Sequence, residues 1–161
     1  QADETIKFFK DRKRTLWTYR CWQNMTTIPI LSYYRFYPIQ SYRKGLDGIA
    51  MWCSYSAKGD DGFDHRDGYD DGINWRGLDK KPVPTKRFHA LREGLEDVAY
   101  LHELKRVMEL AKDKKIDTAE YDKLIAQDID QYISEESQDL VDAWRLEVGT
   151  AIHNLNTKLA Q

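Results

Sequence analysis

The sequence predicts a helix-rich α/β fold in which a strand–helix–strand unit is followed by a long helix. Residues 15–22 and 48–54 are short runs of aromatic, β-branched and apolar residues, which is typical of strands. Residues 31–44, between them, have helical character, and residues 85–108 carry apolar residues at spacings of three and four. This order favours a parallel strand pair with a right-handed crossover, so the long helix is expected to pack back on the same sheet.

The chain is expected to begin with a short helix over residues 1–13. Asp3 and Glu4 favour the start of that helix, because acidic side chains complement the positive end of the helix dipole. Residues 15–22 then form the first strand. A loop around Pro29 is expected to follow it.

The connection over residues 31–44 is expected to be helical in part. Pro38 suits the first turn of a fresh helical segment, where its missing amide costs nothing. Gly45 suits the helix end, because glycine readily adopts the left-handed conformation of a C-cap. The strand at 48–54 begins almost entirely apolar, as expected for a strand buried on both faces.

The long helix is expected to start sharply at Thr85. Pro82 and Pro84 hold the entering chain extended, and the Thr85 hydroxyl can accept hydrogen bonds from the free amides of the first turn. The predicted buried stripe of the helix consists of Phe88, Leu91, Leu95, Val98, Leu101, Leu104 and Met108.

Charged residues and a glycine lie beside that stripe. Gly94 costs about 1 kcal/mol relative to alanine inside a helix, and close approach of another backbone or a bulky ring would explain it. Arg92 and Glu96 attract each other four residues apart. Glu93 and Asp97 repel each other, so this second pair is expected to favour a cation from elsewhere. The plain alternative is a packed helix with solvated charges.

This helix resembles the closing helix of the catalytic domain of glycoside hydrolase family 123 and its relatives. The similar string is PTKRFHALREGLEDVAYL, and its matching positions are Thr85, Arg87, Leu91, Arg92, Glu93, Gly94, Asp97, Tyr100 and Leu101. Residues 45–52, GLDGIAMW, are similar to the last barrel strand of the family, and residues 16–21, LWTYRC, to the strand before it. The resemblance implies the last part of a (β/α)₈ TIM-like barrel.

The resemblance also implies a division of the chain. Residues 1–112 would be the C-terminal portion of the glycosidase-like barrel, and residues 113–161 a C-terminal helical extension packed on it. In the extension, Asp117 or Thr118 can cap one helix, and a long amphipathic helix runs to the end of the chain. The predicted inward positions of that last helix are Leu140, Val141, Trp144, Val148, Ile152, Leu155 and Leu159. Such outer helices are expected to serve stability.

Composition narrows the classes of function. A net charge of -2 gives no argument for nucleic acid, and no apolar run has the length of a membrane span. Most of the ten tyrosines and five tryptophans lie in the first half of the chain, which fits a core or a carbohydrate platform. The chain opens on Gln1 without a signal peptide, which suggests a processed or truncated product and leaves the compartment of the parent open, a secreted or periplasmic parent included.

A glycosidase needs an acid and a second group beside the scissile bond. The resemblance implies substrate-assisted, retaining hydrolysis of N-acetylgalactosaminide-type glycosides, in which an Asp–Glu tandem at a strand end holds the 2-acetamido group and supplies the proton. Asp3-Glu4 opens a helix without a preceding strand, and Glu96-Asp97 has the reverse order on an outer helix. No catalytic residue is therefore assigned, and this chain alone is expected to be inactive.

Substrate contacts are still expected, because barrel active sites form at the C-terminal ends of strands. The predicted substrate-binding residues are Tyr19, Trp52, Tyr55 and Trp75, beside Arg20, Trp22 and Ser54 at the same strand ends. Trp52 is the first choice for a sugar platform, and the alternative is an aromatic side chain that fills the barrel mouth. Arg35 and Arg87 match family arginines and are expected to hold backbone or carboxylate groups.

No metal and no cofactor are predicted. The loop at 57–77 is rich in Asp and Gly like a calcium loop, but its Asp-rich part at 60–71 misses the calcium-loop register, so a solvated barrel loop is expected and calcium binding is the alternative. The four histidines are scattered and lack ligand spacing. Cys21 and Cys53 are too few for a disulfide scaffold and are expected to be free thiols.

An incomplete barrel has two strand edges whose backbone amides and carbonyls are unpaired, so self-association is expected. The apolar faces of Leu16, Ile49 and Met51 are expected to lack the neighbouring strands, and either a second copy or the C-terminal helix would cover them. The alternative to a carbohydrate-active enzyme is a non-catalytic helical interaction or structural module derived from such a barrel.

Overall fold

The computed structural model describes residues 2–20, 29–51, 54, 72–126 and 137–161. The chain divides into two compact units, Gln1–Leu95 and Glu96–Gln161, and the long helix α3 (Lys86–Asp113) contributes to both. The structure thus has the predicted helix-rich α/β composition. The boundary expected after residue 112 separates barrel from extension and stays a prediction.

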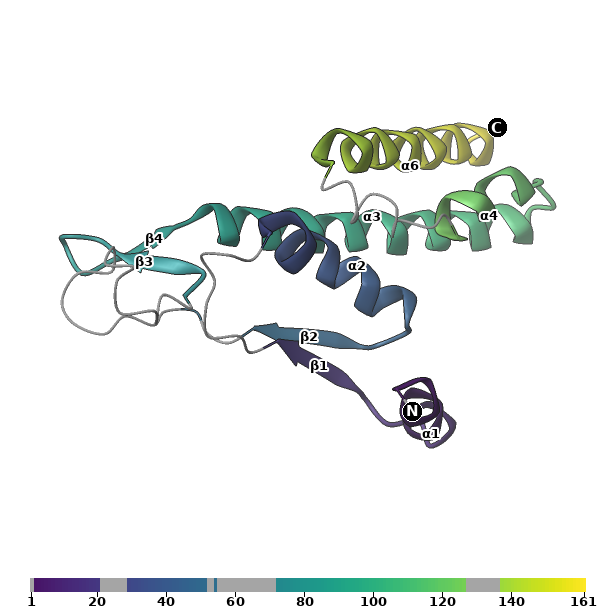
Figure 1. Ribbon diagram of the computed structural model, residues 1–161. Coiled ribbons are helices and arrows are strands. Elements are labelled where there is room, and N and C mark those ends of the chain that lie inside the picture. Colours follow the sequence, from purple (N-terminus) through teal and green to yellow (C-terminus); the bar gives the residue numbers. More distant parts are fainter. Residues whose placement is uncertain (1, 21–28, 52–53, 55–71, 127–136) are drawn as a thin grey trace. The chain divides into compact units, whose positions relative to one another are not determined.

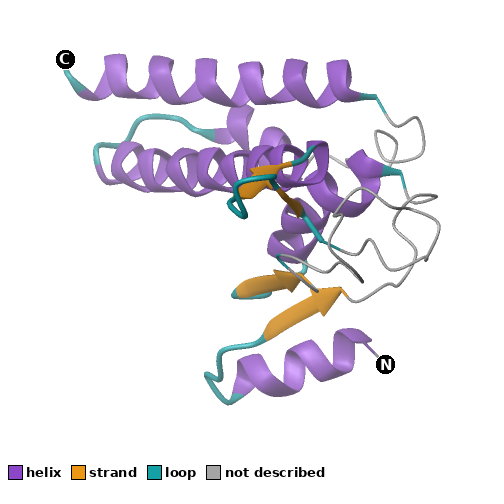
Figure 2. Ribbon diagram, turned by 90° about the vertical axis from the view of Figure 1, so that its left-hand side faces the viewer, coloured by secondary structure: helices purple, strands orange, loops and turns teal. Residues whose placement is uncertain are grey.

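The first unit is built on the predicted strand–helix–strand order (Figure 1). Strands β1 (Trp17–Arg20) and β2 (Gly48–Met51) pair in parallel, which confirms the expected pairing. A π-helical turn, η1 (Leu31–Arg35), and helix α2 (Phe36–Arg43) connect them. Figure 2 shows the two strands as neighbouring arrows.

Three helix ends of this unit follow local chemistry, as expected. The N-terminal helix α1 spans Ala2–Asp11 and has Asp3 and Glu4 in its first turn. Pro38 lies in the first turn of α2. Gly45 follows α2 with a φ of 72°, and its amide donates a 2.8 Å hydrogen bond to the Tyr42 carbonyl. The glycine C-cap is therefore confirmed.

Helix α2 packs on one face of the β1–β2 sheet, and the side chains on the other face are exposed. Thr18 and Arg20 face α2, since the Tyr37 hydroxyl donates to Thr18 Oγ1 at 3.3 Å. Their cross-strand partners are Ile49 and Met51, and partners across a sheet share a face. The expectation that Ile49 and Met51 form the open apolar face was therefore wrong.

The open face belongs to the alternate residues of the same strands. Trp17 is 63% exposed and Tyr19 is 62% exposed. Met51, by contrast, packs against the buried pair Tyr34 and Ala90. Helix α2, which connects the two strands, packs on the face of Thr18 and Arg20. The strand sequences alone did not show which face this helix would cover.

A second, antiparallel pair was not foreseen. Strand β3 (Asn74–Arg76) pairs with β4 (Pro82–Pro84), and among the described residues this pair is a sheet separate from β1–β2. The prediction that Pro82 and Pro84 hold the chain extended is confirmed, and the extended segment also pairs with β3 as a strand. The residues from 55 to 71, which precede β3 and include the Asp-rich loop, lie outside the described part.

Helix α3 begins as its sequence indicates. Thr85 Oγ1 accepts hydrogen bonds from the amides of Arg87 at 3.1 Å and Phe88 at 3.4 Å. The same hydroxyl donates to the Ile73 carbonyl at 2.7 Å, which ties the helix start to the segment before β3. The predicted N-cap is confirmed and has a second role that the sequence did not show.

The explanation for Gly94 is also confirmed. A β-carbon at Gly94 would overlap the carbonyl group of Arg35, so the backbone of η1 approaches α3 at this point. The contact orients the helix and turns Leu95 outward, where it is 49% exposed, against the prediction. The buried stripe instead runs through Ala90, Gly94, Asp97, Leu101, Leu104, Met108 and Ala111.

The second unit is helical. Helix α4 (Ala119–Ala126) and helix α6 (Gln138–Leu159) contact each other. The amide of Ala119 donates to Asp117 Oδ1 at 3.0 Å, and the Ser137 hydroxyl caps α6. The shared core consists of Leu101, Leu104, Val107, Met108, Ala111, Tyr121, Leu124, Val141, Trp144, Val148, Ala151 and Leu155.

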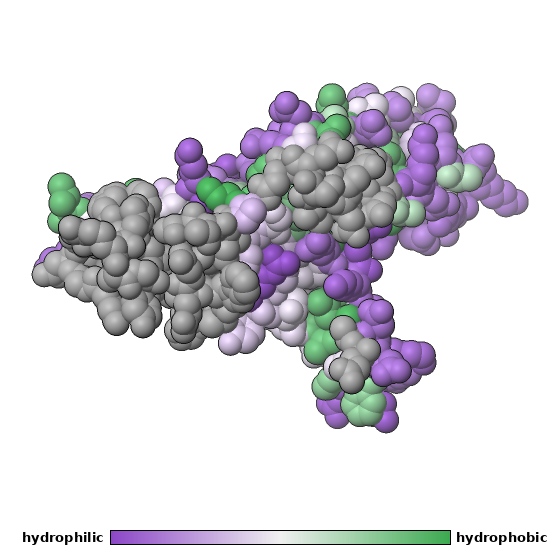
Figure 3. Space-filling model, in the orientation of Figure 1, coloured by the Kyte–Doolittle hydropathy of each residue, from purple (hydrophilic) through white to green (hydrophobic). Residues whose placement is uncertain are grey.

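The outer surface of this helical unit is mainly polar. On the face drawn in Figure 3, hydrophilic residues predominate around α4 and α6, with hydrophobic ones scattered among them. Leu140 was expected to point inward but is exposed. Along the described residues, no helix combines the length and the apolar composition that crossing a membrane requires.

Candidate functional site

The four predicted substrate-binding residues are only partly within the described structure. Tyr19 lies on β1 with its ring on the open face of the sheet. Trp75 belongs to β3, in the other sheet, and its side chain is outside the described part. Trp52 and Tyr55 also lie outside the described residues. Of the four, the described structure places only the side chain of Tyr19, and their shared role stays a prediction.

Trp17 is the aromatic residue that sequence reasoning missed. It lies two residues before Tyr19, so both rings are on the same face of β1. A β-carbon on Gly48, the cross-strand partner of Trp17, would lie 2.6 Å from the indole, so the ring covers this glycine. The glycine at position 48 was a usable sequence signal for this contact, because glycine in a strand often marks a site where another group approaches the backbone closely.

Both aromatic rings of this open face are exposed, and the ring of Trp17 is also supported from one side. The indole of Trp17 rests against backbone on one side, while most of its surface stays exposed. Tyr19 lies nearer to the C-terminal end of β1, and its partner Ala50 is small and exposed. Flat, exposed aromatic surface above small residues suits the apolar C–H faces of a sugar ring.

The opposite face holds the end of β1 in place through Arg20. Its guanidinium donates to the Tyr33 carbonyl at 3.0 Å and to Gln40 Oε1 at 3.3 Å. It also lies over the rings of Tyr37 and Tyr33, at 4.2 and 4.9 Å from their centroids. Burial lowers the pKa of Arg20, and the two tyrosines oppose that shift. Arg20 therefore supports the strand end from behind.

The two family-matching arginines have structural positions. Arg87 is buried, and its Nη1 donates to the Gly72 carbonyl at 3.0 Å. This contact agrees with the expectation that it holds backbone. Arg35 is the last residue of η1, its side chain is buried, and its backbone carbonyl is the group that lies against Gly94. Neither guanidinium lies on the open face of the sheet.

Neither Asp–Glu neighbour pair lies at a strand end. Asp3 and Glu4 are exposed in the first turn of α1. Glu96 and Asp97 lie on α3, where Asp97 is fully buried and accepts a hydrogen bond from Arg145 Nε of α6. Among the described residues there is no group of three or more side chains that could hold a metal ion.

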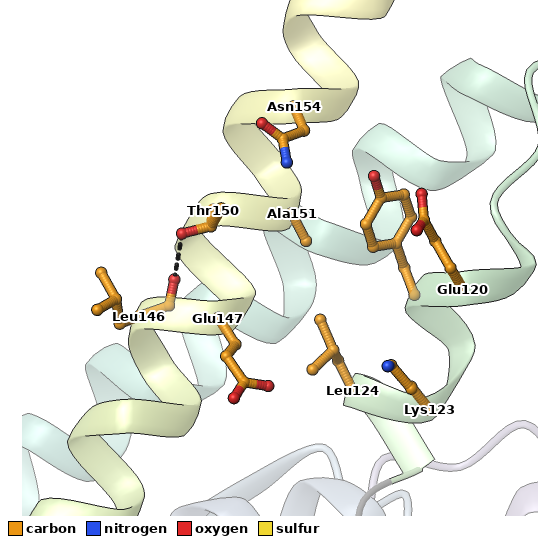
Figure 4. Close-up of a pocket in the computed structure, with 9 residues that line it drawn as sticks. Glu120, Lys123, Leu124, Leu146, Glu147, Thr150, Ala151 and Asn154 are labelled. Carbon is orange, nitrogen blue, oxygen red and sulfur yellow. Dashed lines mark hydrogen bonds between the residues drawn. The ribbon is translucent and has the colours of Figure 1, made fainter.

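A shallow groove of about 350 Å³ lies between α4 and α6 (Figure 4). Leu124 and Ala151 give it an apolar floor, and burial raises the pKa of Tyr121 at its side. Thr150 Oγ1 donates to the Leu146 carbonyl of its own helix at 2.8 Å, so this hydroxyl is already used. The groove lining is Glu120, Tyr121, Lys123, Leu124, Leu146, Glu147, Thr150, Ala151 and Asn154.

The described residues thus define a helix-rich α/β protein whose parallel strand pair carries an open aromatic face. Comparison with protein-family models, with curated proteins and with solved structures finds no match for this chain. The functional interpretation consequently rests on the residues themselves and on the geometry of that face.

Proposed function

We propose that this chain is the C-terminal part of a carbohydrate-active enzyme that resembles glycoside hydrolase family 123. In this proposal β1 and β2 are the last two strands of a (β/α)₈ barrel, and the open face of the sheet is the inner face of that barrel. The main observation in support of this proposal is that the parallel strand pair has α2 on one face and the exposed side chains of Trp17 and Tyr19 on the other.

Two physical points support the barrel. Parallel sheets occur almost only with both faces covered, so an open face indicates that further elements belong there. In a (β/α)₈ barrel the helices cover the outer face and the alternate side chains of each strand point inward. The position of Tyr19, near the C-terminal end of β1, then falls on the active-site side.

The chain would contribute binding rather than proton transfer. The ring of Tyr19 would stack on the sugar, and Trp52, Tyr55 and Trp75 would extend that contact from the following strand end and loop. The Asp–Glu tandem of the substrate-assisted reaction would come from another part of the parent. N-Acetylgalactosaminide-type glycosides are the substrates proposed for that parent, and no turnover is expected from this chain alone.

Titration by nuclear magnetic resonance tests the proposal. The ¹⁵N-labelled chain is titrated with methyl 2-acetamido-2-deoxy-galactoside to millimolar concentrations. We expect saturable shifts of amide signals in β1 and β2. Methyl galactoside, which lacks the acetamido group, is the comparison sugar and should bind about equally, because the groups that hold the acetamido group are proposed to come from another part of the parent. Equal, unsaturable drift with both sugars would argue against a sugar site on this chain.

A non-catalytic helical interaction or structural module is the second candidate. The observation in its favour is that Glu96–Gln161 forms a compact unit with its own apolar core. Leu146 of that unit is 71% exposed, as a partner-binding residue would be. This candidate predicts no response of β1 and β2 to either sugar, so the same titration separates the two.

A further inference from the structure

A buried ion pair links α3 and α6 in the helical unit. Asp97 is 0% exposed, and the side chain of Arg145 is 20% exposed. Arg145 Nε donates to Asp97 Oδ1, and Arg145 Nη1 lies 3.8 Å from Glu96 Oε2. Glu96 is half exposed, so Asp97 is the carboxylate whose charge is removed from water.

Apolar residues lie beside this pair on both helices. Leu101 lies one turn further along α3, and Trp144 and Val148 flank Arg145 on the buried face of α6. Two apolar side chains of similar volume would fit such an interface, and buried ion pairs are frequently no more stabilising than that replacement. A contribution to stability therefore does not explain why charges occupy these two positions.

Part of the apolar face of α6 repeats along the helix. Val141, Val148 and Leu155 recur every seven residues, so for these three a slide of α6 by two turns places apolar on apolar, while Trp144 would take the place of Ala151. A slide of one turn moves Arg145 by about 5.4 Å, out of hydrogen-bond reach of Asp97. The carboxylate would then be buried without this partner. Every position of α6 except the observed one therefore carries the free-energy cost of burying Asp97 without Arg145.

We propose that the Asp97–Arg145 pair sets the position of α6 along α3, and so selects one packing of the helical unit. Buried polar pairs have this role in coiled coils, where they fix register. The sequence already predicted that the Glu93–Asp97 neighbourhood favours an outside cation, and Arg145 supplies it to Asp97. The inference is independent of any carbohydrate function.

The test replaces both charges by apolar groups of similar size, Asp97→Leu with Arg145→Met. The indole of Trp144 is the reporter, because its Nε1 donates to the Leu124 carbonyl of α4 at 3.1 Å. We expect one sharp indole signal for Trp144 in the unaltered chain, assigned through Trp144→Phe. In the double variant we expect split or broadened signals, with a melting temperature equal to or above that of the unaltered chain.

Two controls complete the design. Arg145→Met alone should lower the melting temperature by about 10 °C, because it leaves Asp97 buried without that cation. Glu103→Gln with Arg106→Gln removes an exposed pair from α3 and should leave the Trp144 signal unchanged.

Two outcomes would overturn the proposal. A single sharp Trp144 signal at the native position in the double apolar variant would show that packing alone positions α6. Failure of that variant to fold would contradict it equally, because the proposal requires apolar contacts to hold the unit together without the pair.

Discussion

Single residues decide how the chain packs, and glycines show this most clearly. Gly94 permits the Arg35 carbonyl to lie against α3, while Gly149 on α6 lies beside the ring edge of Tyr100. An added β-carbon would overlap backbone at the first site. At the second it would lie 3.4 Å from Tyr100 Cε1, an ordinary contact. Two helical glycines with the same intrinsic cost therefore differ in what their surroundings require.

We predict opposite effects of alanine at these two sites. Gly94→Ala should lower the free energy of unfolding by about 1–3 kcal/mol, because the overlap outweighs the gain in helix propensity. Gly149→Ala should be neutral or raise it by up to about 1 kcal/mol. Urea unfolding followed by circular dichroism measures both values. A Gly94→Ala protein as stable as Gly149→Ala would show that the Arg35 contact yields easily.

The elements begin and end largely where local chemistry predicts. The caps at Thr85 and Gly45 and the parallel pairing of β1 with β2 were predictable, because they depend on neighbours in sequence or on connection order. The β3–β4 pair was not, because two of the three residues of β4 are prolines, which count against a strand in sequence-based reasoning. The buried place of Asp97 was hidden as well, because its cation comes from 48 residues further along the chain.

The double role of Thr85 gives a prediction at this scale. Thr85→Ala removes both the cap and the hydrogen bond to the Ile73 carbonyl, and should cost about 1–3 kcal/mol of stability. Thr85→Ser keeps the hydroxyl and should cost much less. Thermal unfolding of the two variants side by side measures the difference. Equal losses would mean that the Thr85 methyl group, rather than its hydroxyl, carries the effect.

For the whole molecule, the central feature is the uncovered face of the β1–β2 sheet. The parallel strand–helix–strand unit was readable from the sequence, but which face is open was not, because alternation gives two faces of similar composition. Trp17 and Tyr19, rather than Ile49 and Met51, are the side chains without cover from the described residues. Exposed apolar area favours burial by about 25 cal/mol per Å², so this face favours a partner.

Self-association through this face is therefore predicted, and a sugar bound to the same face should compete with it. Light scattering across dilution should give a mass above the 19.0 kDa of one chain at micromolar concentration. Trp17→Lys with Tyr19→Lys should shift the protein toward the single-chain mass, because two buried like charges oppose pairing. Leu146→Lys, which alters an exposed leucine of α6, is the matched control and should leave the mass unchanged. A constant mass of one chain before any substitution would contradict the prediction.

The most direct test of the proposed function compares two tyrosine variants in the sugar titration. Tyr19→Ala should weaken binding of methyl 2-acetamido-2-deoxy-galactoside by about fivefold, because one stacked ring contributes on the order of 1 kcal/mol. Tyr100→Ala removes a ring that is also exposed, on α3, and should leave the affinity unchanged. Equal affinities of Tyr19→Ala and the unaltered chain, or no saturable binding by either, would contradict the assignment of the β1–β2 face as a carbohydrate site.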